Sequence, residues 1–450
     1  MTFDELRIRH SEFRYESYSH KRVGDKITAE FKYSLKPDIA FTHRLELPIS
    51  VEADDKTLEN LIFHLGMVLS ISYWKSACPA VFHIEAGNLT KEQLTWWKEL
   101  LTNGLGEFYF TNKIDFSVPS FVTLTANIEK PLSKKIACKQ SGRPLIMAGG
   151  GKESVVTLGL LDRKTSGVFQ LNPVTASKEI VKKAGYATVL TARSEIDPAL
   201  LELNKNGYLN GHTPFSAFLA FLGTSIALIN GYEYVIAANE KSAEESSVEY
   251  LGRLINHQYS KTLEFERLFK KYSRLYLTDS VEYFSFLRPL YDLQIARLFS
   301  KYPDQFQYFR SCNIGSKSNS WCLSCAKCAF VFISLFPFLT MGQIIKIFGD
   351  DLYQSEKLYP FFYQLSGLKE RKPFDCVGTY KEAQLAFLLA RQKYIEIGEP
   401  APPDLLKLIE EVENKSATLD ILKKEILENW GETTAPSEFS TILKTAYDRL

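Results

Sequence analysis

Three consecutive glycines, followed by charged and hydroxyl residues, form the segment whose residue types point most directly to chemistry. In "LIMAGGGKESVVTLGLLDRK", residues 145–164, an apolar run reaches these glycines, and a helical pattern follows them. Glycines at a strand-to-helix turn let backbone N–H groups approach an anion closely, and a helix N-terminus favours negative charge. We therefore predict phosphate binding by Gly149, Gly150, Gly151, Lys152, Glu153 and Ser154. The alternative is that the glycines only make a tight turn.

The spacing excludes two familiar phosphate loops. A Walker loop needs four residues between its first glycine and the Gly-Lys pair, and these are missing here. The dinucleotide pattern G-x-G-x-x-G lacks its third glycine.

A second group of chemically capable residues follows the spacing C-x9-C-x2-C-x2-C. Four thiolates can close a tetrahedral zinc site, and closed sites of this kind are structural. The predicted zinc ligands are Cys312, Cys322, Cys325 and Cys328. Buried thiols ahead of an apolar segment, a redox pair and an iron–sulfur cluster are the alternatives.

Composition limits the class of protein. The chain has 45% hydrophobic and 24% charged residues and a net charge of +1, which are ordinary values for a soluble globular protein. The balanced charge gives no long-range field that would favour nucleic acid or an anionic membrane. The N-terminus does not resemble a signal peptide, and the uncharged residues 206–232 contain an apolar part of only about 15 residues, shorter than a membrane span. We predict a cytoplasmic protein with a buried helix at 215–229.

Residues 1–140 alternate apolar and polar residues in "FRYESYSH", "KITAEFKYSL" and "FTHRLELPISV", a pattern typical of antiparallel strands. Helical spacing follows in "TLENLIFHLGMVLSISYWK", then a strand, "AVFHIEAG", and another helix. This region is predicted to be an α+β domain that recognises substrate.

From Pro144 onward, short apolar runs alternate with helices. The strands "PLIMAGG", "GVFQLNP", "YATVLTAR" and "YEYVIAANE" are each separated by helical segments, which predicts a parallel doubly wound sheet. Such sheets bind ligands beyond the carboxyl ends of their strands. Polar residues are expected at those ends: the glycine segment, Asn172, Arg193, Asn239 and Glu240. The predicted domains are therefore 1–140 (α+β), 141–345 (nucleotide-binding α/β, with the cysteines) and 346–450 (helical).

The segment "GGGKES" resembles the pyrophosphate loop S-G-G-x-D-S of the ATP pyrophosphatase family, whose members cleave ATP between the α- and β-phosphates. Gly149 replaces the first serine and Glu153 replaces the aspartate. The backbone N–H donors stay in place, but the substitutions leave open whether the protein can cleave ATP. The resemblance implies an adenine nucleotide alpha hydrolase-like sheet.

Longer phrases resemble one branch of this family, the ATP-dependent epimerases of UDP-N-acetylmuramoyl-L-alanyl-L-glutamate. They are "GGGKES", "GYLNGHTPFSA", "AANEKSAEES", "NHQYSKTLEFE", "SWCLSCAKCAFVF" and "KPFDCVGT", spread over residues 149–379, and "SISYWKSACP" nearer the N-terminus. The resemblance implies that ATP activates the glutamate carboxylate as an acyl-adenylate, which makes its α-hydrogen removable by ordinary side-chain bases. It implies ATP and Mg²⁺ as partners of a UDP-linked muramoyl dipeptide.

Site roles follow from this resemblance. Asn172, Asn239 and Glu240 would border the nucleotide, with Glu240 a candidate Mg²⁺ ligand. Asn210, Gly211 and His212 are expected to open the long helix, where an anion can bind. The residues expected to bind substrate are Asn210, His257 and Lys261, and the candidates for the acid and base are His212 and Cys376. Each has an ordinary structural alternative, such as a helix cap for Asn210, a solvated loop for Glu240 and a small core residue for Cys376.

Three other functions fit parts of the sequence. The chain could be another adenylating enzyme, such as a deazaguanine synthase-like amidase, although the roughly 140 residues before the glycine segment suit a bulkier substrate. The two loop substitutions also allow a nucleotide sensor without turnover. A weaker alternative is a metal-stapled interaction protein in which the loop is only a turn.

Overall fold

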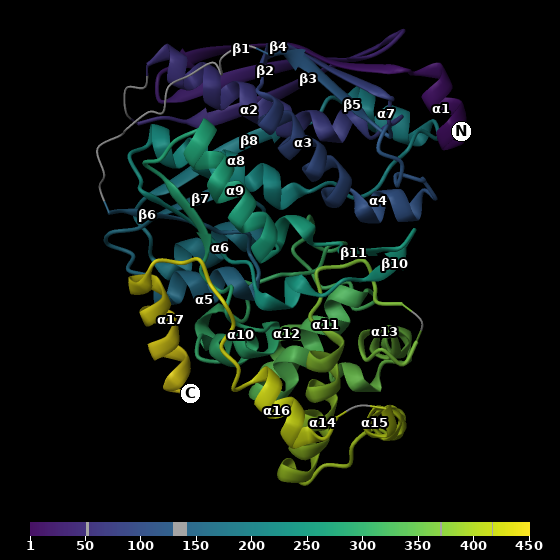
Figure 1. Cartoon of the computed structure of the whole chain (residues 1–450). Coiled ribbons are helices and arrows are strands. Elements are labelled where there is room, and N and C mark those ends of the chain that lie inside the picture. Colours follow the sequence, from purple (N-terminus) through teal and green to yellow (C-terminus); the bar gives the residue numbers. More distant parts are fainter. Residues whose placement is uncertain (51–53, 129–141, 370, 416) are drawn as a thin grey trace. The chain divides into compact units, whose positions relative to one another are not determined.

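The computed structural model describes residues 1–50, 54–128, 142–369, 371–415 and 417–450, so that Cys138 lies outside the described residues (Figure 1). The fold is mixed α/β, with a large, mostly parallel sheet and many helices. The chain forms two compact units. The first comprises residues 1–145, 190–235 and 249–283, and the second comprises residues 146–189, 236–248 and 284–450.

The first unit is built on a set of strands, the first three of which are those that the N-terminal alternation predicts. Its strands are β1 (Glu12–Val23), β2 (Lys26–Leu35), β3 (Ile39–Pro48), β4 (Val81–Asn88) and β5 (Thr123–Asn127), with β8 (Val189–Glu195) beside β3. The pairs β1–β2, β2–β3 and β3–β8 are antiparallel, and β1–β4 and β4–β5 are parallel. The antiparallel prediction for the first three strands is therefore confirmed.

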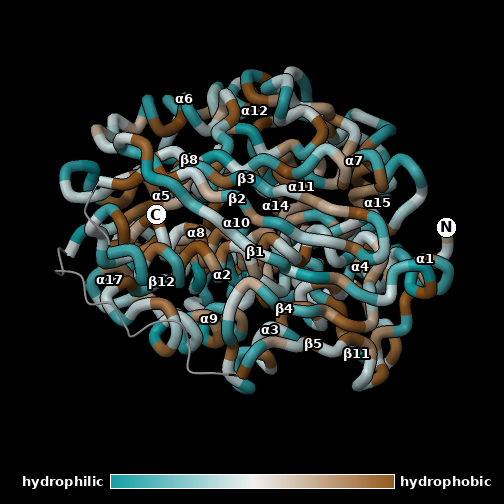
Figure 2. Tube along the Cα trace, turned by 90° about the horizontal axis from the view of Figure 1, so that it is seen from above, coloured by the Kyte–Doolittle hydropathy of each residue, from teal (hydrophilic) through white to brown (hydrophobic). Residues whose placement is uncertain are grey.

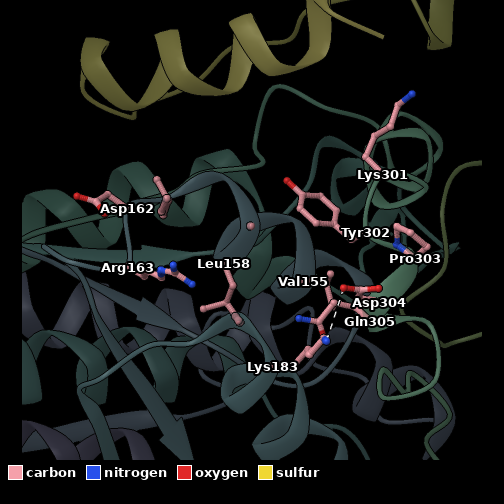
Figure 3. A pocket seen from close by; sticks show the side chains of 13 residues that line it. Val155, Leu158, Asp162, Arg163, Lys183, Lys301, Tyr302, Pro303, Asp304 and Gln305 are labelled. Carbon is pink, nitrogen blue, oxygen red and sulfur yellow. Dashed lines mark ion pairs between the residues drawn. The ribbon is translucent and has the colours of Figure 1, made fainter.

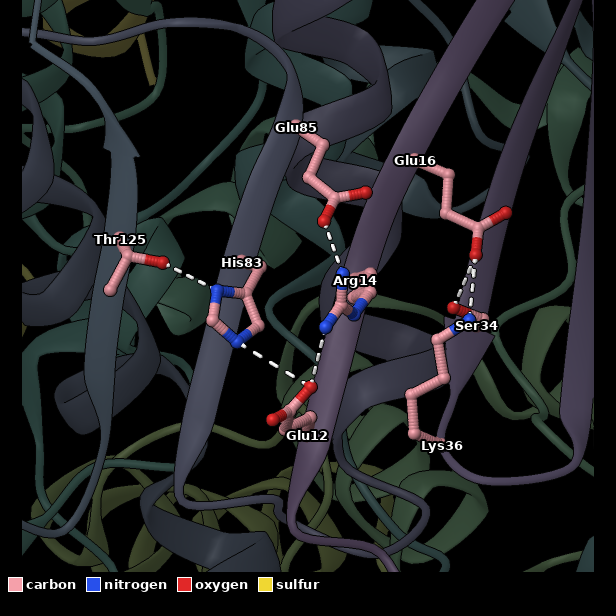
Figure 4. A network of polar contacts seen from close by, with 8 residues as sticks. All are labelled: Glu12, Arg14, Glu16, Ser34, Lys36, His83, Glu85 and Thr125. Carbon is pink, nitrogen blue, oxygen red and sulfur yellow. Dashed lines mark hydrogen bonds and ion pairs between the residues drawn. The ribbon is translucent and has the colours of Figure 1, made fainter.

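Alternation along these strands separates a buried face from a polar one. Phe13, Tyr15 and Tyr33 are fully buried, and α2 (Asp55–Trp74) packs on β1 and β2. Strand residues between the buried ones form a polar network of ion pairs and hydrogen bonds, including Arg14 with Glu12 at 2.7 Å (Figure 4). One face of a half-buried antiparallel sheet meets the core and the other meets solvent, as the period of two requires.

The remaining helices of the first unit are α1 (Phe3–Arg9), α3 (Lys91–Gly104), α4 (Gly106–Thr111), α7 (Pro198–Lys205), α8 (Phe215–Ile229) and α9 (Leu263–Tyr276), and a hairpin joins β10 (Val248–Tyr250) to β11 (Arg253–Ile255). Helix α8 is the predicted uncharged helix. It packs on α2, and both show brown, hydrophobic segments in Figure 2. In the described part of the chain, no helix is long and apolar enough to cross a membrane.

Two details of this region differ from the sequence prediction. Helix α8 begins at Phe215 with Pro214 as its N-cap, so Asn210, Gly211 and His212 precede the helix without opening it. A proline disfavours helical geometry in the residue before it, which explains the later start. Arg193 lies inside β8, because pairing with β3 extends that strand to Glu195.

The second unit contains the carboxyl ends of the strands β6 (Pro144–Met147), β7 (Gly167–Leu171), β9 (Tyr234–Ala237) and β12 (Glu282–Ser285), in the order β12-β9-β6-β7. Two helices follow strands β6 and β7, namely α5 (Lys152–Leu160) and α6 (Thr175–Ala184). The predicted strands at 144–150, 167–173 and 232–240 and the intervening helices are therefore present.

Residues 284–450 of this unit are mainly helical, and the sequence predicts a helical region only from residue 346 onward. The segment 284–450 contains α10 (Asp292–Phe299), α11 (Ala326–Leu335), α12 (Met341–Phe348), α13 (Tyr359–Leu365), α14 (Tyr380–Ile397), α15 (Pro403–Lys415), α16 (Leu419–Ile426) and α17 (Ser437–Asp448). Helix α14 packs against α11, α15 and α16. Gly398 ends α14 in the left-handed conformation that glycine adopts without strain, just before the proline-rich joint near residue 400.

Candidate active site

The glycine segment lies in the second unit, between strand β6 and helix α5. The Gly149 N–H donates to Ser154 Oγ at 2.9 Å, which closes the turn on itself. Gly150 has a φ of +113°, and a Cβ there would lie 3.1 Å from the Ser177 backbone nitrogen. Glycine is required at position 150 for both reasons. At Gly149 an added Cβ would meet no atom within 4 Å, so a serine would fit at that position.

Two charged residues of the turn pair inside the protein. Lys152 is fully buried, and its Nζ lies 2.7 Å from Asp292 Oδ1 and also contacts the Glu153 carboxylate. Burial lowers the pKa of Lys152, but the charges of Asp292 and Glu153 outweigh it and raise that pKa above its usual range. The ammonium group therefore stays protonated, and the two carboxylates balance its charge.

The Glu153 carboxylate lies at the N-terminal end of α5. An added Cβ at Gly151 would come within 2.6 Å of its Oε2, so the carboxylate folds back over the turn. Burial raises the pKa of Glu153, but the ammonium groups of Lys152 and Lys327 lower it to about 2. Glu153 is thus an anion at a position where a helix favours negative charge.

Asp292 begins helix α10 and is held by a second layer of buried contacts. Its backbone N–H donates to Ser242 Oγ at 2.8 Å. The Glu382 carboxylate accepts from the Leu293 N–H at 2.9 Å and from the Thr379 N–H at 2.7 Å. Burial and the charge of Asp292 raise the pKa of Glu382 to about 7. Burial also raises the pKa of Asp292, and Lys152 opposes this increase.

The residues after β9 reach the same charge cluster. Asn239 Nδ2 donates to Ser285 Oγ at 2.9 Å, and the buried Arg288 guanidinium donates to the Glu240 carbonyl at 3.0 Å. Glu240 is buried, and its charge acts on Asp292. Asn172, after β7, is exposed with a φ of +43°. The structure thus brings Glu240 and the glycine turn together around Asp292. Asp292 was not identified as a site residue from the sequence.

The four predicted cysteine ligands come together in the second unit. The four Sγ atoms all lie within 4.8 Å of one another, so the cluster could hold a metal. Backbone N–H groups of Gly315 and Cys322 donate to Cys312 Sγ at 3.1 and 3.4 Å, and the Cys328 N–H donates to Cys325 Sγ at 3.4 Å. Such N–H donors favour thiolates, and four sulfurs at these separations fit a tetrahedral metal.

The segment that carries these cysteines also contacts the glycine turn. The Arg310 N–H donates to the Gly150 carbonyl at 3.0 Å, and an added Cβ at Gly151 would lie 3.0 Å from Ser311 Oγ. Cys376, a predicted catalytic residue, is partly exposed, and its backbone carbonyl accepts from Lys327. Asn313 Nδ2 donates to Asp375 Oδ1 at 2.8 Å, beside it.

Four of the residues predicted to bind substrate or transfer protons lie in the first unit, namely Asn210, His212, His257 and Lys261. His212 and His257 have ring centroids 4.6 Å apart, and both turn Nδ1 toward Glu107. Burial and His257 lower the pKa of His212 to about 4, against an opposing effect of Glu107, and Lys75 and Lys261 act in the same direction as burial. Asn210 Oδ1 accepts from the Gly211 N–H at 2.8 Å, so it does not cap α8. The two predicted acid–base residues, His212 and Cys376, therefore belong to different units.

Sequence inspection missed the carboxylates that these groups share. Glu107 stands between the buried residues Gly106 and Phe108, and Asp292 stands in "PLYDLQIARLF". A single acidic residue inside an apolar run is the signal that could have identified both, because an unpaired charge is costly to bury.

A hollow of about 530 Å³ lies at the other end of α5, away from the glycine turn, and its lining is shown in Figure 3. Lys183 and Asp304 form an ion pair of 3.6 Å across it. The lining contains none of the residues that the sequence predicts for the site.

Taken together, the second unit defines an α/β protein with a glycine-rich strand-to-helix turn backed by a buried ion-pair cluster and a four-cysteine group. Comparison with known families assigns it further. Residues 5–286 match the family model described as the MurL N-terminal domain, and residues 308–418 match the MurL C-terminal domain. The chain belongs to the MurL family.

Three curated relatives carry the name UDP-N-acetyl-alpha-D-muramoyl-L-alanyl-L-glutamate epimerase. The protein from Micromonospora sp. is 34% identical over 84% of this chain and 87% of its own length. That from Salinispora tropica is 32% identical over 90% of both chains, and that from Xanthomonas oryzae pv. oryzae is 30% identical over 74% of this chain and 75% of its own. No solved structure matches the chain.

Proposed function

We propose that the protein inverts the terminal L-glutamate of UDP-N-acetylmuramoyl-L-alanyl-L-glutamate to D-glutamate at the expense of ATP, in the synthesis of a peptidoglycan precursor. The epimerase names of relatives that align with most of the chain support the substrate and the isomerisation. The glycine turn at the start of α5, with Gly150 at a φ of +113°, is the observation that supports the ATP-dependent step.

The proposed reaction begins with adenylation. A carboxylate oxygen of the glutamate attacks the α-phosphorus of ATP, the bond to the β-phosphate oxygen breaks, and diphosphate leaves. The mixed anhydride no longer carries the carboxylate's negative charge, so the adjacent α-hydrogen becomes acidic enough for a side-chain base. A proton returns on the opposite face, and water then releases AMP and the D-glutamyl product.

The residues of the second unit have proposed roles in this sequence. Gly149, Gly150, Gly151 and the first N–H groups of α5 would bind the diphosphate part of ATP, as in other pyrophosphate loops, with Ser154 closing the turn. Glu153 and Glu240 are the proposed Mg²⁺ ligands, because carboxylate oxygens suit that ion. When bound, Mg²⁺ neutralises phosphate charge. Asn172 and Asn239 would border the nucleotide.

Lys152 receives a different role from the one its position suggests. Its ammonium is buried against Asp292 and Glu153. We infer that it stabilises the turn from within and keeps Glu153 ionised, so the donors that meet phosphate would be backbone N–H groups.

The remaining roles extend the sequence predictions. Asn210, His257 and Lys261 are proposed to bind anionic groups of the substrate. The region of residues 1–140 is proposed to recognise the rest of the substrate. His212 and Cys376 are the candidates for proton transfer. The cysteine cluster is proposed to hold a structural zinc ion. Such an ion would fix the segment whose Arg310 N–H holds the Gly150 carbonyl.

The decisive experiment incubates the protein with ATP, Mg²⁺ and the UDP-linked dipeptide, follows AMP and diphosphate, and determines the chirality of glutamate in the hydrolysed product. AMP with D-glutamate supports the proposal. AMP without inversion would instead indicate an adenylating enzyme with another acceptor, and ATP binding without AMP would indicate a nucleotide sensor.

A matched pair of variants connects the activity to the turn. Glu153 and Glu438 both lie in the first turn of a helix, but Glu438 is exposed in α17. We expect E153Q to reduce AMP release at least about tenfold, the effect of about 1.4 kcal/mol on the barrier, and E438Q to leave it unchanged. Equal rates in the two variants would contradict the role of Glu153.

A further inference from the structure

The first unit contains a group of side chains that could bind a metal, and this group is separate from the cysteine cluster of the second unit. Glu107 lies in α4, His212 in the segment before α8, and His257 after β11, so three segments far apart in the sequence converge. One ligand atom from each residue lies within 4.8 Å of the other two. Their side chains are only 11% to 24% exposed, so the group is mostly buried but still reached by solvent.

One separation within this group, that between His212 and Glu107, is close to the separation that a metal imposes on two of its ligands. Nitrogen and oxygen ligands at about 2.0–2.2 Å from zinc stand roughly 3.4 Å apart in a tetrahedral site. His212 Nδ1 lies 3.6 Å from Glu107 Oε2, and His257 Nδ1 contacts the same oxygen more closely. A modest outward movement of His257 would complete a three-ligand arrangement.

The chemistry of the donors indicates which metal fits. Two imidazoles and one carboxylate are borderline donors that suit zinc and its first-row neighbours, whereas Mg²⁺ prefers oxygen ligands. Three protein ligands leave one coordination position open, as in catalytic zinc sites.

The surrounding charges indicate what could complete such a site. Lys75 donates to the Gly211 carbonyl, next to His212, and Lys75 and Lys261 both act electrostatically on His212. The single carboxylate of Glu107 would offset only one of the two positive charges of a zinc ion, and the lysines near His212 add further positive charge. An anionic fourth ligand, a carboxylate or a phosphate, is therefore favoured over a neutral one.

We propose that Glu107, His212 and His257 form a zinc site with one open position for an anionic ligand. The site is separate from the cysteine cluster, which lies in the other unit and offers only sulfur. As zinc ligands, His212 would take no part in proton transfer and His257 would meet an anionic group of the substrate only through the metal, which leaves Cys376 as the candidate for proton transfer. The proposal does not depend on the proposed epimerase activity, because metal binding is measured without substrate.

The test measures zinc bound per full-length chain after equilibrium dialysis, by inductively coupled plasma mass spectrometry. We expect E107Q and H257A each to bind one zinc ion fewer than the unmodified chain. C325S should lose a different ion, so that E107Q combined with C325S loses both. Retention of the full zinc content by E107Q and H257A would overturn the proposal.

The chain offers a matched control in the same unit. His83 Nε2 lies 3.7 Å from Glu12 Oε2 and its Nδ1 lies 2.8 Å from the Thr125 hydroxyl, so its two ring nitrogens face one carboxylate and one hydroxyl group (Figure 4). We expect H83Q to keep the full zinc content. Loss of zinc in H83Q equal to that in E107Q would refute a specific site.

A second readout covers the case in which H257A does not fold. Glutamine at position 107 keeps the shape of glutamate, and the unmodified chain can be titrated with Co²⁺ alone. We expect a component of the visible spectrum without sulfur-to-cobalt absorption, lost in E107Q and displaced by Zn²⁺. A titration that shows only the sulfur-ligated component would overturn the proposal.

Discussion

Separating Lys152 from Asp292 should destabilise the second unit strongly. Lys152 is fully buried, Asp292 is 3% exposed, and their charged atoms are 2.7 Å apart. Removing one member of such a pair typically costs about 3–5 kcal/mol, because the other charge stays buried without its partner. In D292N, Lys152 retains Glu153, so we expect about 3 kcal/mol. In K152M, two carboxylates lose their shared cation, so we expect about 4 kcal/mol.

The coupling between the two positions carries the test. The double variant K152M/D292N leaves neither an unpaired ammonium nor an unpaired aspartate. We expect the double variant to lose less free energy of unfolding than the sum of the two single variants, by at least about 2 kcal/mol, which is within the range for contacting residues. Urea unfolding of the four proteins, followed by fluorescence and circular dichroism, gives each free energy.

An exposed pair provides the comparison. Lys444 and Asp448 are four residues apart on α17, 2.7 Å from each other and about half exposed. Their coupling should be only about 0.3–0.5 kcal/mol. A buried coupling equal to this exposed one would refute the idea that Lys152 is held by internal charges. Lys152 would then be available to phosphate, and K152M would weaken ATP binding without a large loss of stability.

Three further outcomes are expected. G150A should lower the free energy of unfolding by about 2 kcal/mol, because the strain at a φ of +113° and the clash with the Ser177 backbone both contribute. G349A, with a φ of +88° and open space around the added Cβ, should lower it by about 1 kcal/mol. Equal urea midpoints for the two variants would contradict this. Burial lowers the pKa of His64 to about 4, so its neutral form adds stability above about pH 6.5 that is lost as the pH falls toward 4, by up to about 3 kcal/mol. The unfolding free energy of H64Q should therefore fall less steeply over that interval than that of the unmodified chain, and parallel curves would exclude His64 as the cause. C325S should bind ATP more weakly in calorimetry, because the cysteine segment holds the Gly150 carbonyl, and unchanged affinity would show that the turn forms without it.

Periodic patterns predicted most of the elements. The alternation in residues 13–20 and 26–35 and the uncharged run at 215–229 depend only on neighbouring residues, and the strands and the buried helix are found there. The four cysteines could also be grouped, because three of them lie within seven residues. Local spacing constrains local geometry, so these predictions needed no knowledge of the tertiary fold.

The partners of the site residues could not be predicted in this way. Asp292 is 140 positions from Lys152, and Glu107 is 150 positions from His257. Their contacts arise from the order in which strands are placed in the sheet and helices packed on it, and no period in the sequence encodes that order. For the same reason, the burial of Lys152 was missed, since its neighbours in sequence suggest an exposed turn.

The discontinuous composition of the two units has a consequence for the history of the protein. The chain passes from one unit to the other five times, at 145/146, 189/190, 235/236, 248/249 and 283/284. A single genetic crossover could not have joined two independent modules in this pattern, nor could one remove either module. Engineered chimaeras of this family that are made with one crossover should therefore not exchange one complete unit without part of the other.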